Sequence, residues 1–195
     1  MSRFTKQAIM DSFLKIAAKK PISKITVRDV VEDCQVNRNT FYYYFSDIYA
    51  LLEELLVSET ERAIRKSQET ATLAEGFAML FGWIESNYEA FRNIYAEIGR
   101  DSVEYAISKV FDREILAYVR KRAEGIRVSE TDLLLVAGVI RSIYFGALSD
   151  WVKRNVRIDP RVYAKRVEAM FQDSIPEALR IAAALPPFEF PAEEN

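Results

Sequence analysis

A cluster of polar and aromatic side chains fills the segment from Arg38 to Phe45, which reads RNTFYYYF. When its residues are placed about 100° apart on a helix, Phe41 and Phe45 fall on one face, as a small core requires. The other face carries hydroxyl, phenol, amide and guanidinium groups. Hydroxyl and phenol groups donate to phosphate oxygens, whereas amide and guanidinium groups match base edges. The segment therefore predicts contact with a nucleic-acid duplex.

The candidate contact residues lie on this segment and on the helices expected before it. Arg38 and Asn39 are candidates for base edges, and the phenols and hydroxyls for phosphates. The full set of candidate DNA-binding residues is Thr26, Arg28, Arg38, Asn39, Thr40, Tyr42, Tyr43, Tyr44, Lys6 and Lys24. Lys6, Lys24 and Arg3 are expected to add general electrostatic attraction, with direct phosphate contact as the alternative. The alternative for the three tyrosines is packing on the next helix or on the rest of the chain, and Tyr44 lies on the border of the exposed face.

Short helices position this cluster. Apolar residues recur every three or four positions over 5–20, which predicts a first helix that ends at Pro21. The segment Thr26 to Asp29 has the form of a capping box, so a second helix is expected from there to about Cys34. The two phenylalanines of the cluster would then pack on Val30, Val31, Val36 and Phe13.

A three-residue turn, 35–37, joins this helix to the next. Asn37 is a good N-cap for a helix over 38–44. Two short helices joined in this way have the geometry of a helix-turn-helix, whose second helix enters the major groove. A turn of this kind commonly needs a left-handed conformation at Gln35, which is unfavourable for a residue with a side chain.

The segment from Thr5 to Leu56 resembles the DNA-binding head of the TetR family, above all in ITVRDVV from Ile25 and NRNTFYYYF from Asn37. The resemblance places the family's threonine on Thr40, its phosphate-contacting tyrosine on Tyr42, and its usual His/Tyr position on Tyr44. It also places the two flanking aromatics on Phe41 and Phe45. Two positions depart from the family: Gln35 stands where Gly is frequent, and Ile48 where Lys is frequent. The second departure removes one side-chain phosphate clamp, although free amides at that helix start could still bind a phosphate.

The rest of the chain is expected to be helical, so the predicted fold is all-α. A long helix over about 47–67 should link the head to a body with helices near 71–87, 89–97, 101–123, 130–154 and 160–183. The predicted division is a helix-turn-helix domain over 1–50, an effector-binding and dimerisation domain over 51–185, and a flexible tail over 186–195. Two body segments, YEAFRNIY from Tyr88 and GALSDWVKRN from Gly146, resemble the subgroup of the dihydroxyacetone-kinase regulator. That resemblance implies a small-molecule effector and dimerisation through the last two long helices.

Composition and charge exclude several classes of protein. The chain has no histidine, which removes Ser-His and Cys-His pairs and HExxH zinc sites, so we expect no enzyme, no catalytic residues, no metal and no cofactor. Residues 1–50 carry a net charge of +3 and the remainder −5, which favours nucleic acid at one end only. A single cysteine, Cys34, and the lack of an apolar signal segment over 1–20 favour the cytoplasm.

The apolar run from Leu133 to Leu148 contains Arg141 and is short for a membrane span, so a buried helix is expected instead. Gly138, Ser142 and Gly146 form a stripe of small residues along it, which predicts a homodimer interface. The alternative is that this stripe packs on a helix of the same chain.

Aromatic side chains with polar tips are the candidates for an effector site. The predicted ligand-binding residues are Phe81, Trp83, Tyr88, Tyr95, Tyr118, Tyr144 and Trp151. Together these features predict a cytoplasmic TetR-type homodimer that binds an inverted-repeat DNA operator and acts as a repressor released by a small molecule. The alternatives are a ligand-independent regulator or co-activator that acts through a protein partner, and a helical scaffold that does not bind DNA.

Overall fold

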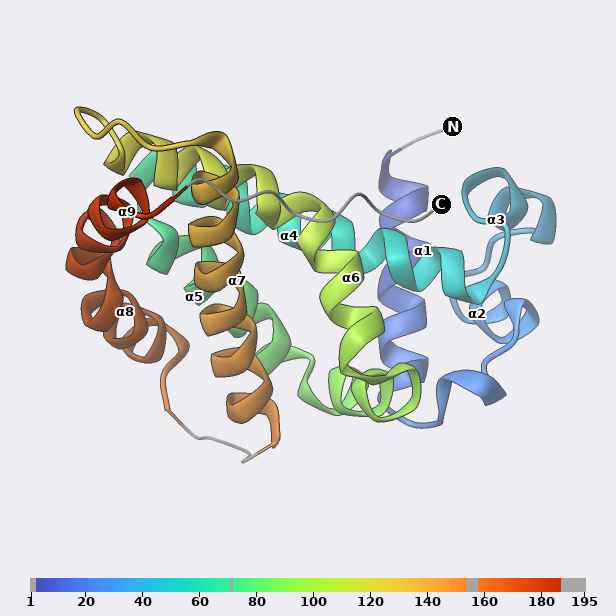
Figure 1. Cartoon of the computed structure of the whole chain (residues 1–195). Coiled ribbons are helices and arrows are strands. Elements are labelled where there is room, and N and C mark those ends of the chain that lie inside the picture. Colours follow the sequence, from blue (N-terminus) through green and yellow to red (C-terminus); the bar gives the residue numbers. More distant parts are fainter. Residues whose placement is uncertain (1–2, 71, 154–157, 187–195) are drawn as a thin grey trace. The chain divides into compact units, whose positions relative to one another are not determined.

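The computed structural model describes residues 3–70, 72–153 and 158–186 (Figure 1). These residues form helices and connecting turns without a strand, which confirms the all-α prediction. The α-helices are α1 (Arg3–Ala17), α2 (Val27–Asp33), α3 (Arg38–Tyr44), α4 (Ile48–Thr70), α5 (Leu73–Ser86), α6 (Tyr88–Arg122), α7 (Glu130–Lys153), α8 (Pro160–Phe171) and α9 (Ile175–Ala184). Two short 3₁₀ helices, η1 (Ile22–Lys24) and η2 (Gln172–Ser174), complete the set. Most of the predicted tail, 187–195, lies outside the described residues.

The chain divides into two compact units. Unit 1 comprises Met1–Arg62 and Leu80–Ile107, and unit 2 comprises Ala63–Met79 and Ser108–Asn195. Helices α4, α5 and α6 therefore each contribute residues to both units. The functional division at about residue 50 stays a prediction.

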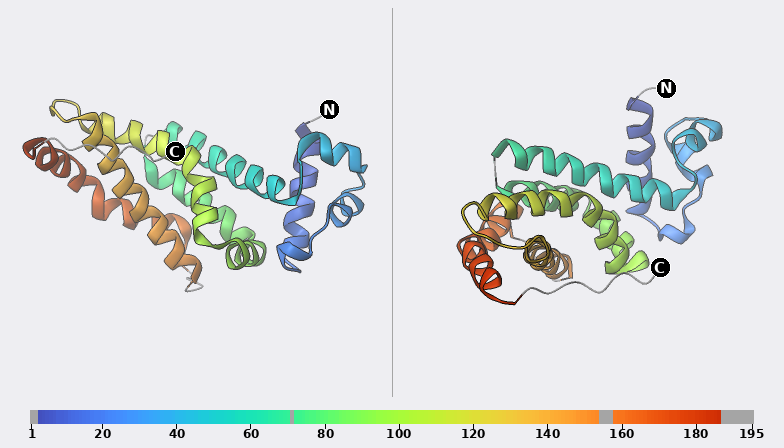
Figure 2. Two further views of the ribbon diagram at one scale, coloured as in Figure 1. Left: turned by 45° about the vertical axis from the view of Figure 1, so that its right-hand side comes forward. Right: turned by 45° about the horizontal axis from the view of Figure 1, so that its top comes forward.

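The start of unit 1 is a small helical core. Phe13 of α1, Val30 of α2 and Phe41 of α3 are fully buried, and both views in Figure 2 show α1 beside α2 and α3. Burying an aromatic side chain of this size contributes roughly 1.5–3 kcal/mol. The hydroxyl of Ser12, also buried, donates to the backbone oxygen of Val30 at 3.2 Å, which ties α1 to α2. The core positions predicted from the sequence are thus confirmed at these residues.

Local sequence signals set the ends of α2. The predicted capping box is present: the Thr26 hydroxyl accepts from the backbone N–H of Asp29, and the Asp29 carboxylate accepts from the N–H of Thr26. Lys20 lies 2.8 Å from the same carboxylate. Hydrogen bonds from Lys20 and Thr26 lower the pKa of Asp29 to about 2, so this cap keeps its charge through the physiological pH range.

The prediction of a single helix over 160–183 is wrong, because this segment forms two helices. Helix α8 ends at Phe171, a 3₁₀ turn follows, and α9 begins at Ile175. The cause is Pro176 in the first turn of α9. A proline in a helix interior lacks an N–H donor and clashes with the preceding turn, whereas it is well tolerated in the first turn.

Helix α6 contains the break that the sequence places at Gly99 and Arg100. Gly99 adopts φ of 79° and ψ of 169° inside the helix, a left-handed φ that glycine adopts readily. The segments expected over 89–97 and 101–123 are therefore two helical stretches that meet at this residue.

Helix α7 runs through the apolar segment of unit 2. By length and composition alone, it is the one helix among the described residues that is apolar enough to cross a membrane, a property shared with core helices of soluble proteins. Some of its side chains lie in the protein interior and others face solvent: Ile140, Tyr144 and Leu148 are buried, whereas Leu135 and Val139 are exposed. One face of α7 thus belongs to the core of unit 2 and the other is uncovered in the single chain.

Candidate DNA-binding site and family

Helix α3 has one buried and one exposed face. Phe41 and Phe45 are 0% and 3% exposed, whereas Tyr42 and Tyr43 are 50% and 66% exposed. Arg38 and Asn39 are exposed as well, and Thr40 and Tyr44 are half-buried. Asn37 caps the helix by accepting from the backbone N–H of Asn39 at 2.6 Å. The residues predicted for phosphate and base contact on α3 therefore share an accessible, polar and aromatic surface.

Two candidates on α2 lie at its first turn. Thr26 is exposed, but its hydroxyl is engaged in the capping box with Asp29 at 2.7 Å and 3.2 Å. The Arg28 guanidinium, 76% exposed, pairs with Glu32 at 2.6 Å. Such a pair at the surface contributes little to stability, so a phosphate could replace Glu32 at little cost.

The basic residues predicted to add electrostatic attraction differ in their surroundings. Lys6 pairs with Glu54 at 2.5 Å, and its ammonium lies 5.9 Å from the centre of the Phe45 ring. Lys24 is exposed at the end of η1. The side chain of Arg3 lies outside the described part of the structure. Lys6 thus links α1 to α4 and α3, a structural role that the sequence did not indicate.

The amides proposed as a substitute phosphate site at the start of α4 are partly occupied. The Asp47 carboxylate accepts from the backbone N–H of Ala50 at 2.8 Å, as an N-cap does. A fixed negative charge at this helix start disfavours a phosphate there.

The turn between α2 and α3 has the geometry that the sequence predicts. Gln35 has φ of 55°, and it is the non-glycine residue with a positive φ in the described ranges. The backbone N–H of Val36 donates to the oxygen of Val31 at 3.0 Å, the six-to-one bond of a Schellman motif. A residue with a side chain therefore occupies a position that favours glycine.

Replacing Gln35 by glycine should stabilise the protein. The left-handed conformation costs a residue with a side chain roughly 1–2 kcal/mol, and the exposed Gln35 side chain offers little packing in return. We expect Gln35→Gly to raise the free energy of unfolding in a urea titration by about 1 kcal/mol. Gln35→Ala, which keeps the strain, should give no such gain, and a lower stability of the glycine variant would contradict this account of the turn.

Two family models match the chain. Residues 9–55 match the model described as bacterial regulatory proteins, tetR family, and residues 71–173 match the model of a transcriptional regulator C-terminal region. The second model alone spans more than half of the chain. The chain belongs to the TetR family of transcriptional regulators. The resemblance seen in the sequence is thereby confirmed.

Individual relatives agree with this assignment. YfiR, an uncharacterised HTH-type transcriptional regulator of Bacillus subtilis (strain 168), is 21% identical over 131 residues, which are 67% of this chain and 63% of YfiR. The chain thus spans less than two thirds of the length of that relative. The solved structure of DhaS, a dihydroxyacetone kinase operon activator, has a TM-score of 0.72 at 13% identity and covers 89% of this chain and 97% of its own. RolR in complex with resorcinol has a TM-score of 0.54 at 19% identity, covering 95% of each chain.

YfiR is described as a transcriptional regulator and DhaS as an operon activator, and RolR was solved with resorcinol as its ligand. At sequence identities this low, the solved structures show only the fold of this chain and nothing about its ligands.

The predicted ligand-binding residues fall into two groups, one in each unit. Phe81, Trp83, Tyr88 and Tyr95 belong to unit 1, where the rings of Trp83 and Tyr95 both pack on Phe91 at 6.3 Å and 6.0 Å. Tyr118, Tyr144 and Trp151 belong to unit 2. The structure thus brings subsets of these residues together within each unit.

One residue of the group in unit 2, Tyr144, belongs to an aromatic stack. Phe77 stacks on Tyr144 at 3.8 Å and on Phe111 at 4.6 Å between ring centres. Burial raises the pKa of Tyr144 far above its usual value and that of Tyr118 to about 12, so both phenols keep their protons at neutral pH. Trp151 is buried in the same unit.

Two charged residues that the sequence reasoning missed adjoin this stack. The Arg122 guanidinium lies 3.5 Å from the centre of the Tyr118 ring, a cation–π contact. Glu168 of α8 accepts from the Tyr118 hydroxyl at 3.4 Å and from the backbone N–H of Leu73 at 3.2 Å. Phenol, carboxylate and guanidinium groups therefore meet beside an aromatic core. Arg122 lies one helical turn after Tyr118, whereas Glu168 is 50 residues away and leaves no local sequence signal.

The stripe of small residues on α7 is open within its own chain. A Cβ placed on Gly138 or Gly146 would meet no atom within 4 Å apart from its own helix and adjacent residues. Ser142 is exposed, and its hydroxyl donates to the backbone oxygen of Gly138 at 2.9 Å. Side chains of α6 line one hollow together with Gly138 and Ser142, so both the dimer interface and packing of the stripe within the same chain stay predictions.

A wholly apolar groove of about 510 Å³ runs between α7 and α9. It is lined by Leu135, Val136, Val139, Ile140, Ile143, Phe171, Ser174, Ile175, Ala178, Ile181, Ala182 and Leu185. Beside α7, a single guanidinium nitrogen of Arg141, Nη1, donates to both carboxylate oxygens of Asp112 of α6, at 3.0 Å and 2.8 Å.

Proposed function

We propose that this chain binds double-stranded DNA through α3 and regulates transcription from an inverted-repeat operator. The observation that carries the proposal is the division of α3 into a buried face of Phe41 and Phe45 and an exposed face with Asn39, Tyr42 and Tyr43. The need to form a core explains the two buried phenylalanines, but it does not explain why three consecutive tyrosines stand between them. In a helix-turn-helix, the exposed face of the second helix is the one that meets the groove. Such a regulator would act in the cytoplasm.

A pair of substitutions on α3 tests the proposed division of labour. Tyr42→Phe removes a phenol, and a lost phosphate hydrogen bond carries no sequence information. We therefore expect a weaker affinity for all DNA sequences by a similar factor, roughly two- to tenfold for a bond of 0.5–1.5 kcal/mol.

Asn39→Ala should instead relax the preference at particular base positions by roughly 1–3 kcal/mol if the contact is bidentate. Affinities measured on a panel of operators with single base changes separate the two effects. An effect of Tyr42→Phe confined to one base position would refute its phosphate role, and an unchanged preference in Asn39→Ala would remove that residue from base readout.

We further propose that the regulator is a homodimer that pairs through α7 and α9. The open small-residue stripe of α7 and the apolar groove beside it support this arrangement. Leu135, Val139 and Ile181 are 39%, 53% and 56% exposed in the single chain, which is a large apolar surface for a monomer to leave in water. A twofold axis would place two copies of α3 on successive half-sites.

Ligand control belongs to the proposal as well. The effector would bind beside the aromatic stack of unit 2, where Tyr118, Tyr144, Arg122 and Glu168 supply polar groups. Repression relieved by the effector is the family default, and DhaS, an operon activator, shows that activation is the alternative within this fold.

Within unit 1, two hydrogen bonds attach α6 to the helices of the head and would transmit such a change. The Asn93 amide donates to the backbone oxygen of Ala17 at 2.8 Å, at the end of α1. The Glu97 carboxylate accepts from the backbone N–H of Ser23 at 2.7 Å. Both residues precede the break at Gly99, so movement of this part of α6 would pull on α1 and η1 directly.

A further inference from the structure

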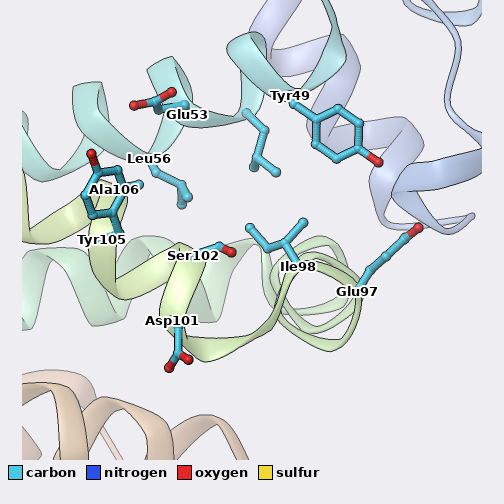
Figure 3. Close-up of a pocket in the computed structure, with 10 residues that line it drawn as sticks. Tyr49, Glu53, Leu56, Glu97, Ile98, Asp101, Ser102, Tyr105 and Ala106 are labelled. Atoms are coloured by element: carbon cyan, nitrogen blue, oxygen red, sulfur yellow. The ribbon is translucent and has the colours of Figure 1, made fainter. Parts of the chain in front are cut away.

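A hollow of about 670 Å³ lies between α4 and α6 in unit 1 (Figure 3). Its lining from α4 is Tyr49, Leu52, Glu53 and Leu56, and its lining from α6 is Glu97, Ile98, Asp101, Ser102, Tyr105 and Ala106. The α6 residues lie on both sides of the break at Gly99. None of them is among the residues assigned to DNA contact or to the proposed effector site.

The inner wall of the hollow is apolar. Leu52, Leu56 and Ala106 are 2%, 2% and 4% exposed, and Ile98 is half-buried beside them. An apolar group that binds here would remove its own apolar surface and that of the inner wall from contact with water. This removal is the main favourable contribution to binding in such sites.

The rim of the hollow is aromatic and acidic. Tyr49 and Tyr105 are 57% and 65% exposed, and Glu53, Glu97 and Asp101 are exposed as well. In Figure 3, Tyr49 and Glu97 stand at one end of the hollow and Tyr105 and Glu53 at the other, whereas Asp101 points away from α4. Each end therefore combines the face of a phenol ring with a carboxylate.

The charged side chains among the described lining residues are all acidic, and the chain has no histidine. Hydrogen bonds from Ser23 hold the pKa of Glu97 below its usual range, and Lys24 contributes in the same direction, so this carboxylate is anionic at neutral pH. Carboxylates and tyrosine faces both attract cations, and the tyrosine faces do so best when the cation is poorly hydrated.

We propose that this hollow binds a small amphipathic organic cation, an amine or quaternary ammonium carried on an apolar body. The apolar body would lie on Leu52, Leu56 and Ile98, and the cationic group at the end of the hollow that carries Tyr105 and Glu53. This ligand class goes beyond the proposed function, because the site belongs to the unit that contains the helix-turn-helix and requires neither DNA nor an effector in unit 2.

Calorimetric titration of the full-length protein with octyltrimethylammonium, below its micelle concentration, tests the proposal. Octanoate and octanol are also built on eight carbons in a chain, with a negative charge or with none. We expect the cation to bind with at least tenfold higher affinity than either of them. Absence of cation binding, or equal binding of octanoate, would overturn the proposal.

Two variants place the binding at the hollow. Glu53→Gln keeps the shape of the side chain and removes one negative charge, and Tyr105→Leu removes one exposed ring. Each substitution should lower the affinity for octyltrimethylammonium about fivefold or more. Glu124→Gln, at an exposed glutamate of unit 2, serves as the control and should bind like the parent protein. Because both rim residues are exposed, circular dichroism should show unchanged helicity. Parental affinity in a protein that carries both Glu53→Gln and Tyr105→Leu would assign the cation to another site. The titration contains no DNA, so its failure leaves the DNA-binding proposal intact.

Discussion

Gly146→Leu is expected to convert the proposed dimer into a well-folded monomer that no longer binds its operator tightly. Gly146 of α7 is half-buried, and a Cβ placed on it has no atom within 4 Å outside its own helix and adjacent residues. In a helix interior, leucine has a more favourable helix propensity than glycine by up to about 1 kcal/mol. The single chain should therefore tolerate the change.

The substitution should destabilise only the dimer. A leucine on the small-residue stripe would hold two copies of α7 apart, and overpacking costs about 1–3 kcal/mol at each of two symmetric sites. Specific DNA complexes are typically 10³–10⁷-fold tighter than non-specific ones, and two linked heads supply much of that margin. We expect operator affinity to fall by about a hundredfold or more while weak, salt-sensitive DNA binding persists.

Sedimentation equilibrium at micromolar concentration measures the assembly directly. Gly82→Leu is the matched control, because Gly82 is also a helical glycine with open space around its Cβ, but it lies on α5. This control should sediment like the parent. A Gly146→Leu protein that stays dimeric and binds its operator tightly would place the interface elsewhere.

Two neighbouring aromatic residues of α3 should respond in opposite ways to the same truncation. Phe41 is fully buried, so Phe41→Ala should cost about 3–5 kcal/mol of stability, a large part of the 5–15 kcal/mol typical of a domain. Tyr43 is 66% exposed, so Tyr43→Ala should change stability by no more than about 0.5 kcal/mol.

DNA binding should show the reverse contrast at a temperature where both proteins are folded. Tyr43→Ala should lose affinity about two- to tenfold per half-site, as expected for one lost phosphate contact. Urea titration and fluorescence anisotropy on a labelled operator give the two quantities. Unaltered operator affinity in Tyr43→Ala would assign this ring to packing, the alternative that its sequence position left open.

The features predicted correctly are those whose cause lies within a few residues. Thr26 and Asp29 form a capping box because the two side chains satisfy amides three positions apart, and Gln35 is left-handed because a helix ends just before it. The division of α8 from α9 has an equally local cause in Pro176, so that error came from giving apolar periodicity precedence over a proline.

Features that depend on distant segments were not predictable in the same way. The bond from Asn93 to Ala17 and the one from Glu97 to Ser23 each join residues more than 70 positions apart. The sequence shows only that Asn93 is polar within an apolar stretch. The predicted ligand residues divide between two units for the same reason, because aromatic composition says nothing about which rings meet.

Selection of bound sequences from a pool of random double-stranded DNA tests the central proposal most directly. The full-length protein should enrich an inverted repeat whose half-sites are centred about one helical turn or a multiple apart. Its affinity for the selected DNA should fall steeply as salt concentration rises, because cationic side chains displace counterions from phosphates. Enrichment of no sequence, together with no salt-dependent retention on DNA, would contradict the proposal and leave a helical scaffold as the remaining interpretation.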